Sequence, residues 1–339
     1  MANTDISLVR RLLWATLALG CPAGAAAQPA APTHIQLGAA AASVSYIAPY
    51  IAVSKGYFRD AGLDVEIANF QGGAKAMEAM LGGSVDGVIG SYSYTILMAA
   101  KGRQVQAFAN FLRCPAFVVA VGKNSQATTI KDLKGLKLGV TSPGSSTQQA
   151  LNYLFVKAGL TAQDYTPVAI GNTAGAVAAV RYGKVDGLLL VDPVISVLQD
   201  AGDIRLIEDM RTEAASVRGF GGPYPEGSLL ATQSWLTAHP AAAQGLAQGI
   251  VRADRWMQTA SPEDITAALP AAIVGPDKAL FAKSITRMKS CFSPDGVIPA
   301  DGPPQVLDIL ATSDPSLRTA GVALPSTYTN AFVEKVPAQ

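Results

Sequence analysis

The chain has 339 residues, of which 49% are hydrophobic and 15% are charged, and its formal net charge is +1. This length suits one large domain or two medium ones, with a core that needs no disulfide staples. The near-zero charge and the lack of Lys/Arg runs argue against a nucleic-acid partner, which would require a basic surface. The mean hydropathy of +0.26 is high, but a membrane-spanning helix needs roughly 20 consecutive apolar residues.

The one stretch that approaches such a span lies at the N-terminus and resembles an export signal. Arg10 and Arg11 precede a short apolar segment, and three alanines end at Ala27. This order predicts a signal peptide over residues 1–27, cleaved near Ala27. An uncleaved membrane anchor is the alternative, but the apolar segment is short for a span. Lipoprotein processing at Cys21 is disfavoured, because the three preceding residues match a lipobox poorly.

The segment after the signal alternates strand-like and helix-like patterns. Apolar residues at Ile47, Tyr50, Ile51 and Phe58 share one face of a helix, and Gly62 is placed to supply a left-handed turn after it. The first module is predicted to comprise strands at 35–39, 63–69 and 85–90, with the second helix at 74–81.

A second module repeats the first at an offset of 100 residues. Residues 70–89 and 170–189 share seven of 20 aligned positions, including Asp86 with Asp186. Strands separated by helices run parallel, with ligands bound outside their carboxyl ends. Two modules therefore predict two α/β lobes that face each other across a hinged cleft. The second module is predicted to have strands at 136–141, 166–170 and 185–191, with helices at 147–158 and 174–182.

The remaining segments complete the two lobes. The sequence predicts that the chain beyond Ser261 wraps the first lobe. Further strands are predicted at 105–111, 116–121, 204–207 and 229–232, with a long helix at 241–257.

Three pairs of chemically capable residues invite a functional interpretation. Asp86 and Asp186 open strands away from the cleft end, so we expect a structural role for both. Cys114 and Cys291 are permitted to pair in an oxidising compartment, although two buried free thiols are the simpler interpretation. The chain has only two His residues and no metal-ligand spacing, so no metal site or cofactor is expected.

Four segments together resemble one protein family: 46–67, 72–87, 130–146 and 178–193. The family is that of the periplasmic substrate-binding proteins of ABC importers, in the nitrate, sulfonate, taurine and thiamine-precursor group. The resemblance implies a type II periplasmic binding protein fold of class α/β, with a ligand cleft between two lobes and two hinge crossovers. It also implies a monomeric periplasmic receptor without cofactor, whose partners are an inner-membrane permease and its cytoplasmic ATPase. Lobe 1 is predicted at 33–113 and 215–339, and lobe 2 at 114–214.

Polar residues follow the carboxyl ends of the predicted strands in both modules. Their hydroxyl, amide and backbone N–H groups suit a polar ligand, although plain helix caps and turns are the alternative for most of them. Asp192 is favoured as a helix cap before Pro193; a carboxylate facing the cleft would instead favour an amine or ring N–H. The candidate ligand residues are Ser43, Ser45, Tyr46, Gln71, Gly72, Gly73, Ser91, Tyr92, Ser142, Ser145, Ser146, Thr147, Asn172, Thr173 and Asp192.

The predicted ligand is a small polar molecule: a sulfonate, a nitrate-like or carboxylate anion, or a pyrimidine-type heterocycle. A pyrimidine-precursor enzyme of the same fold is one alternative, and the lack of clustered cysteines and of a cleft histidine argues against it. A binding protein that feeds a sensor or another transporter type is the other alternative.

Overall fold

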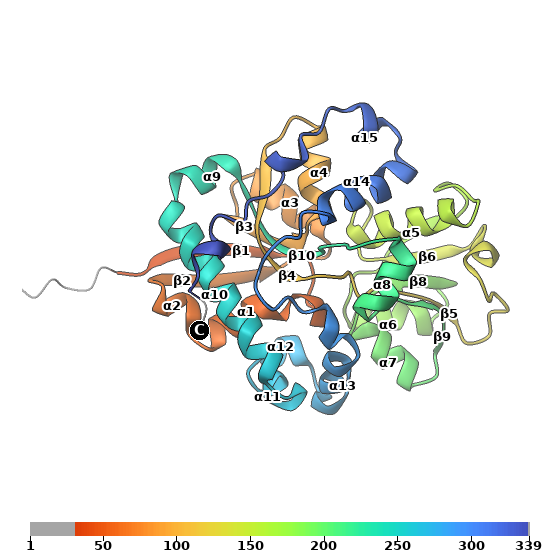
Figure 1. Cartoon of the computed structure of the whole chain (residues 1–339). Helices are drawn as coiled ribbons and strands as arrows, with labels where there is room; N and C mark the ends of the chain where they lie inside the picture. Colours follow the sequence, from red (N-terminus) through yellow and green to blue (C-terminus); the bar gives the residue numbers. More distant parts are fainter. Residues whose placement is uncertain (1–30, 338–339) are drawn as a thin grey trace, which may run out of the picture. The chain divides into compact units, whose positions relative to one another are not determined.

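The structure is a computed structural model that describes residues 31–337 (Figure 1). The predicted signal peptide, its cleavage point and Cys21 lie outside the described residues. Within 31–337, no helix combines the length and the apolar character needed to cross a membrane.

The described chain folds around two five-stranded sheets of the same topology. The first has the order β2-β1-β3-β10-β4 and the second the order β7-β6-β8-β5-β9. The strands are β1 Thr33–Ala39, β2 Leu63–Asn69, β3 Gly87–Ser91, β4 Val105–Leu112, β5 Val118–Gly122, β6 Lys137–Val140, β7 Thr166–Ala169, β8 Gly187–Leu190, β9 Ile204–Asp209 and β10 Gly227–Thr232.

The strands within each predicted module run parallel. β1 pairs with β2 and β3, and β6 pairs with β7 and β8, all in parallel. The fourth strand of each sheet is antiparallel, since β10 lies between β3 and β4, and β5 lies between β8 and β9. The antiparallel strand of each sheet is thus the first strand after the chain crosses from the other sheet. β5 follows β4 into the second sheet, and β10 follows β9 back into the first. The duplication inferred from sequence is confirmed as two α/β lobes.

Helices join and cover these strands (Figure 1). In the first half they are η1 Val44–Tyr46, α1 Ile47–Ser54, α2 Tyr57–Asp60, α3 Gly73–Leu81, α4 Ser93–Ala100, η2 Ile130–Leu133, α5 Ser146–Lys157, α6 Ala174–Arg181, α7 Val194–Asp200 and α8 Glu213–Phe220. In the second half they are α9 Gln233–Ala238, α10 Pro240–Thr259, α11 Pro262–Ala267, α12 Ala271–Val274, α13 Lys278–Met288, η3 Lys289–Cys291, α14 Gly302–Ser313, α15 Ser316–Thr319, η4 Leu324–Ser326 and η5 Val333–Lys335.

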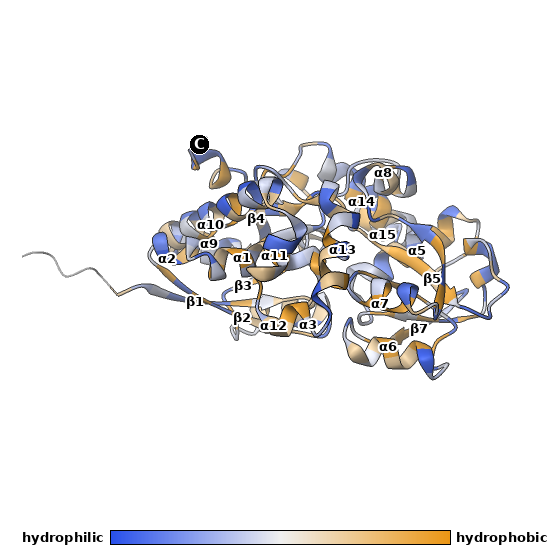
Figure 2. Cartoon of the chain, turned by 90° about the horizontal axis from the view of Figure 1, so that it is seen from below, coloured by the Kyte–Doolittle hydropathy of each residue, from blue (hydrophilic) through white to orange (hydrophobic). Residues whose placement is uncertain are grey.

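The apolar residues of the central strands form the core. Every residue of β3 and β8 is buried, as expected for strands covered on both faces. Figure 2 shows the hydrophobic colour along strands such as β5, and hydrophilic residues gathered on helices such as α2 and α10. The high hydropathy of the chain therefore belongs to buried strands in the part that the structure describes.

Asp86 and Asp186 play matching structural roles, as predicted. Each carboxylate accepts a 2.8 Å hydrogen bond from a backbone N–H, that of Gln36 for Asp86 and that of Lys137 for Asp186. Each aspartate also donates its own N–H to the same neighbour's carbonyl oxygen at 2.8 Å. The pair thus fixes the central strand of each module against the adjacent parallel strand.

The first predicted helix is shorter than its apolar face suggested. Gly56 has φ of 75° and separates α1 from α2, so Phe58 belongs to a second short helix. Gly62 has φ of 76°, which confirms the predicted left-handed turn before β2. The break arises because a left-handed residue ends the helical hydrogen-bond pattern, whereas the apolar spacing alone continues across it.

The chain beyond Ser261, which was predicted to wrap the first lobe, contacts both lobes. Helix α14 packs against α4 of the first lobe and also against α5 of the second. Helix α13 lies against α7, where Lys283 and Arg287 pair with Asp200 at 2.7 and 3.2 Å. Helical spacing shows which face of α13 or α14 is apolar but not which lobe covers it, so only the packing revealed this bridging role.

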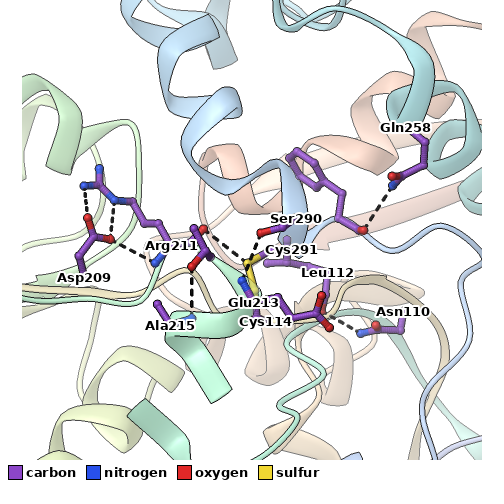
Figure 3. The surroundings of a disulfide bond; sticks show 12 residues. Asn110, Leu112, Cys114, Asp209, Arg211, Glu213, Ala215, Gln258, Ser290 and Cys291 are labelled. Carbon is purple, nitrogen blue, oxygen red and sulfur yellow. Dashed lines mark hydrogen bonds and ion pairs between the residues drawn. A yellow bond between two sulfur atoms is a disulfide. The ribbon is translucent and has the colours of Figure 1, made fainter. Parts of the chain in front are cut away.

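Cys114 and Cys291 form a disulfide, so the free-thiol interpretation is wrong (Figure 3). Their Cα atoms are 5.1 Å apart. The bond lies at both passages between the sheets, which are 113–117 and 210–226. Arg113 donates its N–H to the Cys291 carbonyl at 2.7 Å, and the Arg211 carbonyl lies 3.6 Å from Cys291 Sγ. The 177-residue separation conceals this contact from sequence reasoning.

Candidate functional site

Four loops meet at a small enclosed cavity between the two lobes. They follow β1, β2, β6 and β8, and so lie at the carboxyl ends of parallel strands, where α/β sheets bind ligands. The cavity volume is about 20 Å³, which is about the space that one ordered water requires. Its lining residues are Ala40, Ala41, Ser43, Ser45, Tyr46, Gly73, Pro115, Phe117, Thr141, Ser146, Thr147, Val191 and Glu226.

The first-lobe wall carries two hydroxyl groups without partners. Ser43 and Ser45 are 1% and 2% exposed, and neither Oγ makes a hydrogen bond with another described residue. Neither caps a helix, because Ser43 precedes η1 without a side-chain cap bond. The expected alternative role as helix caps is therefore wrong for both. Buried polar atoms are normally satisfied, so these hydroxyls are available to a bound molecule.

The second-lobe wall is a hydroxyl network at the start of α5. Thr141, Ser145 and Thr147 bond to one another at 2.7 to 3.0 Å, which fixes the loop. Ser142 Oγ, in contrast, is buried without a partner. The Ser146 N–H donates to the Tyr94 hydroxyl of the first lobe at 3.2 Å. Helix α5 thus presents its N-terminal end toward the cavity, with one N–H already occupied by the opposite lobe.

Two glycines allow close packing beside the cavity. A Cβ atom on Gly72 would lie 2.1 Å from Ser142 Oγ, and one on Gly73 would lie 2.4 Å from the Tyr94 hydroxyl oxygen. Gly72 also has φ of 117°, which L side chains rarely adopt. The neighbouring Gln71 is exposed at the rim. Gly72 therefore permits close approach of the opposite lobe, and Gly73 permits close packing of Tyr94 within the first lobe. A ligand contact at either glycine stays a prediction.

Glu226 is a cavity residue that the sequence did not predict. It directly precedes β10, whose first residue Gly227 pairs with Ser91 at the end of β3. Because β10 is antiparallel, its amino end reaches the edge where the parallel strands end. Tyr46 and Ser91 donate to the two Glu226 carboxyl oxygens at 3.2 and 2.5 Å. Burial raises the pKa of Glu226 to about 7, against neighbouring hydroxyl hydrogen bonds that lower it.

Only knowledge of the strand order would have identified Glu226. The sequence places it more than 130 residues from Ser91, in a Pro- and Gly-rich turn without a motif. The one feature that could have indicated it is a glutamate directly before an antiparallel strand, whose first residue lies at the cleft edge of the sheet. That signal needs the direction of β10, which the local pattern does not contain.

Three predicted residues have other partners. The Tyr92 hydroxyl bonds to Thr327 Oγ1, so its ring lies away from the cavity. Thr173 accepts from the Gly175 N–H at 3.4 Å and caps α6. Ser91 is buried beneath Glu226 and does not line the cavity.

Asp192 bonds to the start of α7 from one residue before the N-cap position, which Pro193 occupies instead of the predicted Asp192. Its Oδ1 accepts from the Ser196 N–H of α7 at 2.8 Å, and its Oδ2 lies 3.3 Å from the Arg211 guanidinium. Both partners of this ion pair are nearly fully buried. The carboxylate therefore does not face the cavity, whereas the Asp192 carbonyl accepts from Val44 N–H of the first lobe at 3.1 Å.

A larger groove lies on the other side of this contact. Its volume is about 800 Å³, and mostly apolar residues of α6, α7, α12 and α13 line it. Asn172 lines the groove and donates to the Ala42 carbonyl at 3.3 Å, which leaves its buried Oδ1 unpaired. The smaller cavity is the candidate site, because the four strand ends and the unpaired hydroxyls of Ser43 and Ser45 converge there.

The comparisons with known proteins agree with this architecture. A family model described as "NMT1/THI5 like" matches residues 44–264. The chain belongs to this family. Over 271 residues, or 78% of this chain and 79% of the relative, it is 24% identical to YtlA of Bacillus subtilis, itself named only as a candidate binding protein.

Structures of similar proteins are known. A protein structure from Bordetella bronchiseptica is 40% identical with a TM-score of 0.87, over 90% of this chain and 96% of that one. The alkanesulfonate-binding protein SsuA of Xanthomonas axonopodis, bound to MOPS, is 22% identical with a TM-score of 0.72, over 88% of this chain and all of that one. The fold is thus the two-lobed periplasmic binding protein fold.

One family relative is an enzyme. A fragment of 138 residues, 41% of this chain and 39% of the relative, is 26% identical to a pyrimidine phosphate synthase of Schizosaccharomyces pombe. The relative matched over most of this chain is named as a binding protein.

Proposed function

We propose that this chain is the solute-binding receptor of an ABC importer. It captures a small polar molecule in the cavity between the lobes and delivers it to an inner-membrane permease with its ATPase. The periplasm is the compartment in which it would work, after removal of the signal peptide. The buried, unpaired hydroxyls of Ser43, Ser45 and Ser142 carry this proposal, because leaving buried polar groups unsatisfied costs free energy that a bound ligand would recover.

The ligand enters by movement of the lobes. A 20 Å³ cavity is far smaller than the roughly 300–1,000 Å³ of typical ligand pockets. Lobe 1 (33–113 and 215–339) and lobe 2 (114–214) would separate about the two passages, which meet at the disulfide. Opening would break the contacts of Val44 with Asp192 and of Ser146 with Tyr94. Closure would then enclose the ligand and form the surface that the permease recognises.

The proposed ligand contacts combine both lobes. Hydroxyls at Ser43, Ser45, Tyr46, Ser146 and Thr147, together with Glu226 and backbone at Gly73, face the enclosed space. Ser142 carries a buried unpaired oxygen on the loop before α5, and Asn172 carries one at the larger groove. Gln71 and Gly72 belong to the loop before α3. Ser91 supports Glu226, and Ser145 fixes the α5 loop.

Binding without turnover tests this function. Thermal unfolding of the purified protein would be measured with alkanesulfonates, nitrate, carboxylates and pyrimidines, and each stabilising compound would be re-examined by mass spectrometry after incubation. We expect a melting-temperature increase with the compound unchanged. Ser45→Ala should weaken binding about tenfold without lost stability, because its hydroxyl has no protein partner. Ser84→Ala is the matched control at an exposed site. Conversion of the compound would support the enzyme alternative instead.

A further inference from the structure

Glu226 is held rigidly at the cavity. Its N–H donates to the Leu112 carbonyl at 2.9 Å, and its carbonyl accepts from Tyr92 N–H at 2.8 Å. The residue is 1% exposed. Because the backbone is bonded on both sides to first-lobe residues, Glu226 has a defined position relative to the first-lobe loops.

The protein supplies this carboxyl with neutral donors only. Oε1 accepts from Tyr46 and Oε2 from Ser91, and a hydrogen bond with the Ser146 hydroxyl also lowers the pKa of this carboxyl. A carboxylate offers about four acceptor positions, so at least one stays open. The titratable groups that act on it are three tyrosines: Tyr46 from η1, Tyr94 from α4 and Tyr224 from the segment before β10. All three are neutral, since burial raises the pKa of each hydroxyl.

No positive charge of the chain meets this carboxyl in the described structure. The residues that line the cavity include no Lys, Arg or His. The ion pairs found within 31–337 leave Glu226 out. An isolated buried carboxylate is unfavourable unless a partner charge or donor compensates it. Glu226 lines the cavity, so a molecule bound in the cavity can supply the compensating charge or donor.

The hydroxyl groups of the cavity do not discriminate between donor and acceptor ligands. Hydroxyls such as those of Ser43 and Ser45 rotate and either donate or accept a hydrogen bond. They therefore suit an anionic head, a carbonyl oxygen or an amine equally. An ionised carboxyl group, in contrast, only accepts hydrogen bonds. It therefore binds a hydrogen-bond donor and repels an anionic group placed at the same point.

We propose that Glu226 selects a ligand that carries an ammonium, amino or ring N–H group, whose donor bonds to this carboxylate. This inference rests on the proposed function. It predicts that a bare oxoanion without a donor is a poor ligand, although the hydroxyls of the opposite wall still accommodate an anionic or acceptor group elsewhere on the same molecule. The ligand class is thus a small polar molecule with both a donor and an acceptor end.

Matched pairs of compounds test the selection. Isothermal titration at pH 7.5 would compare 2-aminoethanesulfonate with ethanesulfonate, β-alanine with propanoate, and 4-aminopyrimidine with pyrimidine. In at least one pair, the donor-bearing member should bind about tenfold or more tightly. Glu226→Gln, which keeps the side-chain shape, should reduce that preference to less than about threefold. The control is Glu66→Gln, at an exposed position of β2, which should leave the preference unchanged.

Two results would overturn the proposal in distinguishable ways. If the donor-free members bind as tightly as their partners, or more tightly at pH 6 than at pH 8, then Glu226 takes up a proton beside an anion and the selection is refuted while receptor function stands. If no compound of either kind binds the wild-type protein, the proposed receptor function fails and the selection fails with it.

Discussion

At the residue scale, the cavity combines flexible hydroxyls with one fixed carboxyl group. Within residues 31–337, the Ser43 and Ser45 hydroxyls make no hydrogen bond, and Glu226 accepts from neutral hydroxyls such as those of Tyr46 and Ser91. Desolvation is the largest effect on Glu226 and favours its neutral form. The pKa of Glu226 is about 7, so a bound donor or a small change of pH near neutrality alters the charge of its carboxyl group.

Glu226 should make stability depend on pH. Its pKa is raised from 4.5 to about 7 in the folded state, so the folded protein binds this proton more tightly than the unfolded chain. The stabilisation is full below pH 4.5 and is lost as pH rises through 7. The total loss is about 3 kcal/mol. Urea melts of wild type and Glu226→Gln at pH 5 to 8 should show the variant gaining relative stability by about that amount across the series.

A constant difference between the two proteins over this pH range would contradict the shifted pKa. Glu66→Gln, at an exposed site, controls for the general effect of removing one carboxyl group.

At the element scale, the loops between strands and helices decide how closely the lobes meet. The loop before α3 contributes Gly72, and the loop before α5 contributes Ser142, with almost no space between them. The backbone N–H of Gly72 also donates to the Ala40 carbonyl at 2.8 Å, which fixes the first loop against the end of β1. The close contact of the two lobes therefore requires a glycine at position 72, which has no Cβ to meet Ser142.

Gly72→Ala should impair closure. The new methyl group would lie 2.1 Å from Ser142 Oγ, and the φ of 117° adds backbone strain of about 1–3 kcal/mol. We expect ligand affinity, measured by titration with the best-binding compound, to fall about tenfold or more. Adding Ser142→Gly should recover only part of this loss, because it removes the steric contact and leaves the strain. A double variant that is no better than Gly72→Ala would contradict the steric account.

At the scale of the whole molecule, the C-terminal half ties the two lobes together. Helix α14 contacts helices of both lobes, and α13 pairs with Asp200 of α7. The disulfide joins the first passage to η3, and the second passage lies against the same cysteine (Figure 3). The proposed movement of the lobes would therefore occur about two passages that lie beside one disulfide.

Removing the disulfide should lower stability. Cys114→Ser with Cys291→Ser frees a loop of 177 residues in the unfolded chain, so we expect the free energy of unfolding to fall by about 2–5 kcal/mol. Guanidinium melts would measure this loss, and the reduced wild-type protein should show a similar one. Equal stability of oxidised and reduced wild type would indicate that the bond is absent in solution.

The sequence by itself determined the repeated module, the positions of the ten strands and the structural role of Asp86 and Asp186. These follow from local periodicity and from a duplicated pattern, which the chain carries in neighbouring residues. It also directed attention to the loops at the strand ends, where Ser43, Ser45, Tyr46 and Ser146 now line one cavity.

Only the tertiary structure decided the partners of these groups. The antiparallel insertion of β10 brings Glu226 to the edge of β3, and the folding of the C-terminal segment brings Cys291 to Cys114. It also turns Tyr92 toward Thr327 and Asp192 toward Arg211. Each of these contacts joins residues that are distant in sequence or depends on strand direction. Such contacts are set by packing and chain topology, which local residue patterns do not encode.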